Sequence, residues 1–215
     1  MNDMDLRQLI LDELEFQPAL NAAHIGASVD GGIVTLTGHV ESFAQRLAAE
    51  ESVKRIKGVA AVALDIEVRY PEHKKLADDQ IAKRAVDILD WDVRLPEGAL
   101  QVTVSDGWVK LTGDVDWYYQ KEAAEHAIWK LSGVLGVINL IRIAPKQHVP
   151  DIERRIRQAL LRNATLESQQ IDVHVDGGKI TLTGTVNALS DRSLAERAAW
   201  AAPGVQDVTN ELQLA

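Results

Sequence analysis

The sequence predicts an α+β protein of three tandem α-β-β-α-β modules, each a three-stranded sheet with two helices on one face. A segment that ends in Leu-Thr-Gly occurs three times, at residues 29–38, 104–113 and 175–184, and a Gly-Val pair comes twenty residues after each closing glycine. The closing glycines are 113 − 38 = 75 and 184 − 113 = 71 residues apart. This spacing suits a small domain, since solenoid repeats run roughly 20–50 residues. We place the modules at residues 1–70, 76–145 and 149–215.

Each module is expected to begin with an amphipathic helix. In the first copy, Leu6, Ile10 and Leu14 recur at helical spacing, which predicts one buried face. The aligned positions in the other copies are apolar as well: Ile81, Ala85, Leu89, Ile152, Ile156 and Leu160. Aspartates at or near the start of each helix favour its exposed amides and its dipole.

A hairpin is expected next, because apolar residues alternate on both sides of an Asp-Gly-Gly or Ser-Asp-Gly turn. On the returning strand, six residues are predicted to point inward: Val34, Leu36, Val109, Leu111, Ile180 and Leu182.

The second helix is rich in alanine and glutamate, and its Gly-Val ending is typical of a helix C-cap. A last strand should alternate through Val62, Leu64, Ile66 and Val68, with Asn139 and Asn210 at the places that match Leu64. We interpret the repeated glycines as residues required by the backbone conformation and not as active-site residues: Gly38, Gly58, Gly113, Gly133, Gly184 and Gly204.

Composition limits the functions open to this chain of 215 residues. Its net charge of −9 argues against nucleic acid and against broad contact with anionic membranes, both of which require clustered Lys and Arg. It has no cysteine, so disulfides and thiolate metal sites are excluded. The acidic start shows no secretory signal and no apolar run approaches the ~20 residues that span a bilayer, so we expect a cytoplasmic protein.

No catalytic or nucleotide-binding motif is present, and the paired glycines belong to hairpin turns that do not open helices. We therefore expect no enzyme activity and no cofactor. Asp172, His174 and Asp176 alternate on one strand, but the aligned residues are merely polar, so we predict no metal site there.

The order of elements, the strand that ends in Leu-Thr-Gly and the Ala/Glu-rich helix closed by Gly-Val resemble the BON domain family, in three tandem copies. Members of that family are mostly envelope proteins linked to osmotic stress, phospholipid contact, envelope integrity and, in one branch, potassium sensing. The resemblance thus implies a stress-related, transport-associated binding protein and offers the periplasm as the alternative compartment. It implies no catalytic residues.

The middle copy is the one with an unusual aromatic load. Trp117, Tyr118 and Tyr119 open its second helix, and Trp108 lies beside its hairpin. Aromatic side chains with a polar edge suit contact with lipid or protein, which makes these four the candidate contact residues. The alternatives are that Trp117 packs on a neighbouring module and that Tyr118, which replaces apolar residues in the other copies, is structural.

The sequence therefore predicts a non-catalytic adaptor that contacts a protein partner or a phospholipid surface. Two alternatives stay open: a sensor of a small ligand or of a monovalent cation such as potassium, and a self-assembling structural module that forms homo-oligomers.

Overall fold

The computed structural model describes residues 2–144, 151–163, 166 and 170–215. The first module contains helix α1 (Asp3–Phe16), the short 3-10 helix η1 (Ala22–His24), strands β1 (Ile25–Asp30) and β2 (Ile33–Val40), helix α2 (Phe43–Lys54) and strand β3 (Ala61–Val68). A second 3-10 helix, η2 (Glu72–Lys74), leads into the next module.

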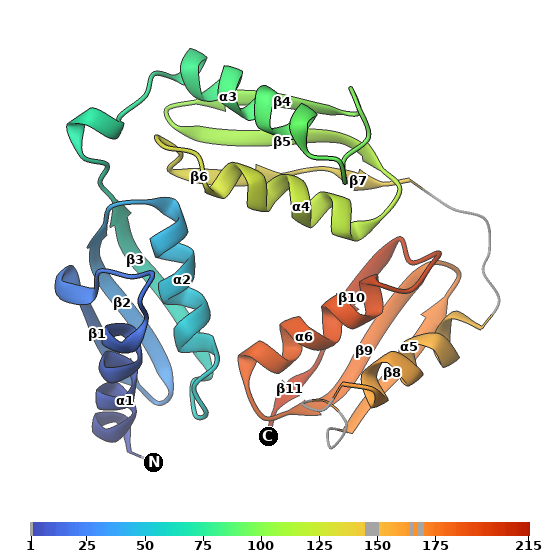
Figure 1. Ribbon diagram of the computed structural model, residues 1–215. Helices are drawn as coiled ribbons and strands as arrows, with labels where there is room; N and C mark the ends of the chain where they lie inside the picture. Colours follow the sequence, from blue (N-terminus) through green and yellow to red (C-terminus); the bar gives the residue numbers. More distant parts are fainter. Residues whose placement is uncertain (1, 145–150, 164–165, 167–169) are drawn as a thin grey trace.

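The other two modules repeat this order. The second has α3 (Asp78–Trp91), β4 (Leu100–Ser105), β5 (Trp108–Val115), α4 (Tyr118–Trp129), β6 (Gly136–Asn139) and β7 (Arg142–Ile143). The third has α5 (Ile152–Leu161), β8 (Gln170–Asp176), β9 (Lys179–Val186), α6 (Leu189–Trp200), β10 (Asp207–Asn210) and β11 (Gln213–Leu214). The α+β prediction is confirmed (Figure 1).

In each module the second strand is the centre of the sheet. β2 pairs antiparallel with β1 and parallel with β3, and the helix α2 makes the crossover that a parallel pair requires. β5 and β9 occupy the same central place in their modules. Both helices pack on one face, and the six inward residues predicted on the returning strands are each at most 1% exposed. Each module thus has a core of its own.

An aspartate at the start of the first helix fastens the hairpin turn in two modules. The carboxylate of Asp3 accepts the N–H of Gly31 at 2.9 Å. Asp78 does the same for the N–H groups of Asp106, at 2.7 Å, and Gly107, at 2.9 Å. These carboxylates therefore join helix to hairpin, a role beyond the favourable helix dipole expected from the sequence.

The last strand is continuous only in the first module. Asn139 in the second module turns its side chain to α4, and its Oδ1 accepts the N–H of Ile141 at 3.2 Å, at the point between the end of β6 and the start of β7. Asn210 makes the equivalent bond to Leu212 in the third module. Leu64 can make no such bond, and β3 runs unbroken past it.

The three modules meet around a common centre. Helices α2, α4 and α6 all face inward in Figure 1, and side chains from each module contact the next, as described below. α6 also contacts α2, so the chain closes on itself. The six repeated glycines all have positive φ, from +88° at Gly133 to +132° at Gly113, which agrees with a role in the backbone.

Candidate functional site

The three inward helices define one set of equivalent positions. α2, α4 and α6 are each 12 residues long. Their first residues are Phe43, Tyr118 and Leu189, and their last residues are Lys54, Trp129 and Trp200. The first residue of each helix lies against the last turn of the helix in another module, and this relation repeats around the centre.

At the junction of the first and second modules, the ring of Phe43 meets the indole of Trp129 edge to face, with centroids 6.5 Å apart and planes at 70°. Tyr70 closes the same junction. Its hydroxyl donates to the carbonyl of Val134 at 3.0 Å and accepts the N–H of Phe43 at 3.5 Å. Burial raises the pKa of Tyr70 above its usual value, so the phenol stays neutral and able to donate.

At the junction of the second and third modules, Tyr118 stacks on Trp200. Burial is the main reason that the pKa of Tyr118 rises to about 12, and the carboxylates of Glu122 and Glu196 add to it. Burial also raises the pKa of Glu122, although the positive charge of Arg197 in the third module lowers it in part. The junction is therefore aromatic at its core and acidic at its edge.

Among the residues that the structure describes, no aromatic pair lies at the junction of the third and first modules. Leu189 packs against the core of the first module, and Lys54 stands where the other two helices have tryptophan. The ammonium group of Lys54 pairs with Glu50 one turn earlier. A solvent-open hollow of about 350 Å³ lies here, lined by Lys54, Leu189, Arg192, Ser193, Glu196 and Asn210.

A glutamate occupies the eighth position of each inward helix: Glu50, Glu125 and Glu196. The side-chain amide of Asn139 donates to Glu125 at 2.9 Å, and that of Asn210 donates to Glu196 at 3.3 Å. These asparagines were treated from the sequence as ordinary strand positions. The change from Leu64 to asparagine at a position predicted to point inward was the signal that could have revealed them.

Trp108, one of the four predicted contact residues, lies on the sheet face that the helices leave uncovered. It is 46% exposed, and its ring lies over Gly136 on the neighbouring strand. Ile138, at 43% exposed, lies beside Lys110 on the same face, and Leu140, at 55%, follows it. The first and third modules have Ala63 and Thr209 in place of Ile138, so this apolar face belongs to the second module.

Trp117 and Tyr119 lie at the other end of β5 from Trp108, about 23 Å along a strand of this length. Trp117 is the half-buried N-cap residue of α4, and its backbone N–H donates to the side-chain oxygen of Gln120 at 3.0 Å. Tyr119 is 52% exposed. The structure therefore does not bring the four aromatics together: Tyr118 is engaged within the chain, and Trp108 belongs to a separate surface.

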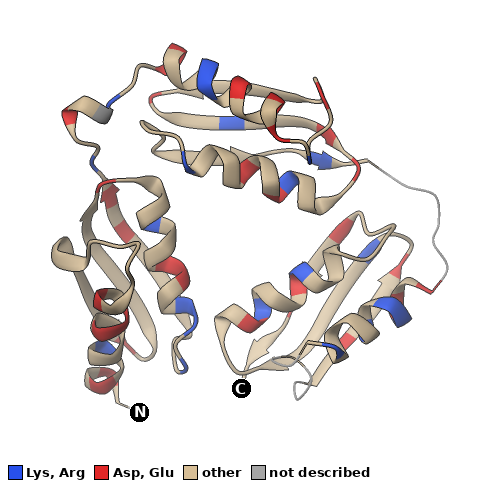
Figure 2. Cartoon of the chain, viewed as in Figure 1, with Lys and Arg blue, Asp and Glu red and all other residues tan. Residues whose placement is uncertain are grey.

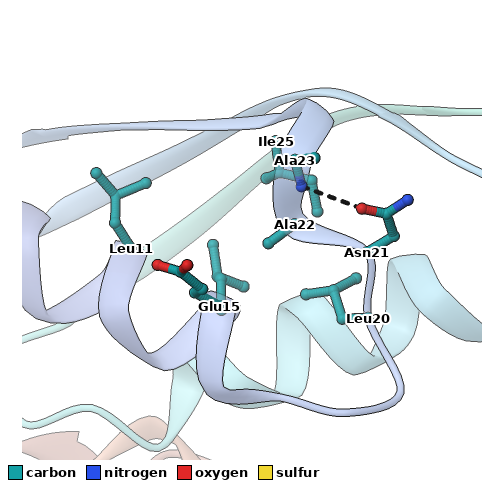
Figure 3. Close-up of a pocket in the computed structure, with 8 residues that line it drawn as sticks. Leu11, Glu15, Leu20, Asn21, Ala22, Ala23 and Ile25 are labelled. Carbon is teal, nitrogen blue, oxygen red and sulfur yellow. Dashed lines mark hydrogen bonds between the residues drawn. The ribbon is translucent and has the colours of Figure 1, made fainter.

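A larger hollow of about 510 Å³ lies between α1 and η1 (Figure 3). Leu11, Leu20 and Ile25 supply apolar walls, and Glu15 supplies the only ionisable group of its lining. Asn21 is occupied in capping η1, where its side chain accepts the N–H of Ala23 at 3.3 Å. One carboxylate without a polar partner in the lining gives a ligand little to recognise.

Within the described residues, no three His, Asp or Glu side chains are grouped so as to hold a metal ion. Asp172, His174 and Asp176 lie exposed along β8. Basic and acidic residues occur together on the helices of all three modules (Figure 2). Over the same described part of the chain, no helix has the length and apolar character that a membrane span requires.

The fold and its junctions define a protein of three repeated small α+β modules that pack on one another. This chain belongs to the BON domain family, whose model matches residues 2–70, 77–145 and 148–215. The expectation of three tandem copies of that domain is confirmed.

A curated relative is "Osmotically-inducible protein Y" of Escherichia coli (strain K12). It is 29% identical over 144 residues, which cover 65% of this chain and 71% of that protein. Among solved structures, the C-terminal domain of CdsD, a structural protein of the type III secretion system of Chlamydia trachomatis, is matched over the whole of both chains with 14% identity. The TM-score of 0.27 is too low for any argument from that likeness.

Proposed function

We propose that this chain is a non-catalytic binding protein of the osmotic stress response, which uses its second module to hold a protein partner. The family and the similarity to an osmotically inducible protein support the stress-related part. The apolar sheet face formed by Trp108, Ile138 and Leu140, called here the outer face of the second module, is the observation that supports the binding part.

An exposed sheet face with a tryptophan suits a protein interface, because Trp is enriched among the few residues that carry most of the binding energy at such surfaces. The charge of the chain favours protein over phospholipid. Only Lys110 among the residues of β5 and β6 is basic, and the net charge is −9, so the chain as a whole would be repelled by an anionic bilayer.

The test is affinity capture from osmotically stressed cells with the tagged wild-type chain, Trp108→Ser and Trp91→Ser in parallel. Trp91 is 88% exposed at the end of α3 and serves as the matched control. We expect a protein that is retained by wild type and Trp91→Ser and lost with Trp108→Ser. If no captured protein depends on Trp108, or if Trp108-dependent sedimentation with phosphatidylglycerol vesicles is seen instead, the proposal of a protein partner is wrong.

A further inference from the structure

Two of the three junctions are filled by an indole that the chain itself supplies. Trp129 lies beside Phe43, and Trp200 lies beside Tyr118. In both cases the indole comes from the last position of an inward helix and contacts the first residue of the inward helix in another module. The guanidinium of Arg46 lies 6.0 Å from the centre of the Phe43 ring, so a cation borders the aromatic contact as well.

The third junction is formed by the equivalent helix positions but has no indole. The hollow there is lined by Leu189, Arg192, Ser193 and Glu196, which occupy positions one, four, five and eight of α6. The matching positions at the filled junctions are Phe43, Arg46, Leu47 and Glu50, then Tyr118, Lys121, Glu122 and Glu125. Lys54 replaces the tryptophan, and its pairing with Glu50 directs its ammonium group back along α2.

We propose that the hollow between the first and third modules binds an aromatic side chain, Trp or Tyr, from a protein partner. At both filled junctions an indole lies against the first residue of the neighbouring inward helix, and at the Phe43 junction a basic side chain, Arg46, borders the contact. The volume of about 350 Å³ lies at the lower end of the range of small-ligand pockets, which is about 300–1,000 Å³, and suits one aromatic ring.

The lining also limits which kind of aromatic side chain can bind in the hollow. Leu189 provides the apolar floor, and the Lys54 stem and Arg192 can border the ring face. Lys54 is paired with Glu50, and Arg192 and Glu196 of the lining carry opposite charges, so the charges around the hollow balance. A neutral aromatic side chain therefore fits better than one next to a carboxylate. This site is separate from the outer face of the second module.

Titration of the full chain with N-acetyl-tryptophanamide, followed by amide NMR shifts, tests the proposal, with N-acetyl-leucinamide as the non-aromatic probe. We expect shifts at Lys54, Leu189 and Ser193 with a dissociation constant of about 1 mM, as suits a small fragment, and little or no effect of the leucine probe.

Lys54→Trp should abolish these shifts and raise the melting temperature, because the new indole fills the hollow as Trp129 and Trp200 fill theirs. Lys54→Ala is the matched control and should keep the shifts, since it removes the lysine without filling the space. The proposal is overturned if the tryptophan probe moves no amide at this junction, if the two probes act alike, or if Lys54→Trp binds like wild type. Trp108→Ser should leave this binding unchanged, which separates the result from that of the proposed partner capture.

Discussion

Tyr118 and Trp200 stack face to face across the junction of the second and third modules, with ring centroids 4.6 Å apart and planes within 7° of parallel. The two residues are 82 positions apart in the sequence, from 200 − 118. Because the stack joins two otherwise separate cores, it couples the stability of one module to that of its neighbour.

Replacing Trp200 with alanine should lower the free energy of unfolding by about 2 kcal/mol, since a half-buried indole loses its apolar contacts. Tyr118→Ala should act in the same direction. In a double-mutant cycle measured by urea unfolding, we expect a coupling energy of about 1 kcal/mol between them. Tyr119→Ala is the control, because Tyr119 is exposed and should show no coupling with Trp200. Additive single effects at Tyr118 and Trp200 would show that the stack contributes nothing of its own.

Ionisation of Tyr118 in this stack should lower the stability of the fold at high pH. The pKa of Tyr118 is raised from 10.0 to about 12 in the fold, so the folded chain holds this proton more tightly than the unfolded chain. Its contribution is therefore complete below pH 10.0 and is lost as the pH rises towards about 12. Melting curves across that interval should fall more steeply for wild type than for Tyr118→Phe, which cannot ionise. Equal slopes would contradict the raised pKa.

Substitution of Glu122 should raise the stability of the fold, unlike substitution of Tyr118 or Trp200. Burial raises its pKa above 4.5, so the ionised carboxylate is disfavoured in the fold at neutral pH. The neutral Glu122→Gln should be more stable than wild type at pH 7. This advantage should shrink as the pH falls through the raised pKa and be gone below 4.5, where Glu122 is protonated in the folded and the unfolded chain. Glu51→Gln, an equal charge change at an exposed site on α2, is the control for net charge. A Glu122→Gln chain that is no more stable at pH 7 would rule out this account.

The elements of each module could be predicted because the same constraints act three times. Val34, Val109 and Ile180 are apolar in every copy because each lies in a core of its own. The arrangement of the modules could not be predicted in this way. Trp129 and Trp200 match Lys54, so the residue that closes two junctions is not shared by all three copies. Only the structure shows which distant residues meet.

The candidate contact residues illustrate the same limit. The sequence predicts contact residues at two places, the hairpin and the start of the second helix, and the eight-residue strand β5 holds Trp108 and Trp117 apart. Tyr118 was weighed as structural because its equivalents are apolar, and the stack on Trp200 agrees with that interpretation. The outer face of the second module emerged only when the parallel pairing placed Ile138 beside Lys110.

Gly38 is expected to tolerate no side chain. Its φ is +119°, and a Cβ atom there would lie 1.9 Å from the carbonyl oxygen of His24, a backbone atom that cannot move aside. Gly38→Ala should therefore cost about 3 kcal/mol or more in unfolding free energy, or prevent folding of the first module. Gly31→Ala is the matched control: its φ is +56° but the space around it is open, so we expect a cost of about 1 kcal/mol. Similar costs for both variants, by thermal or urea unfolding, would contradict the steric explanation.

Asn139 should prove necessary for the interrupted strand of the second module. Its Nδ2 donates to the carbonyl of Lys121 at 3.1 Å and to Glu125, while its Oδ1 accepts the N–H of Ile141. Asn139→Ala removes all three of these bonds and should cost about 1–3 kcal/mol. Hydrogen exchange at the Ile141 amide should become faster, while the Leu212 amide, held by Asn210 in the third module, should be unaffected. Asn139→Leu, which copies Leu64, should recover part of the loss if the strand can then run unbroken as β3 does. An Ile141 amide protected as well in Asn139→Ala as in wild type would mean that the side chain does not set the break.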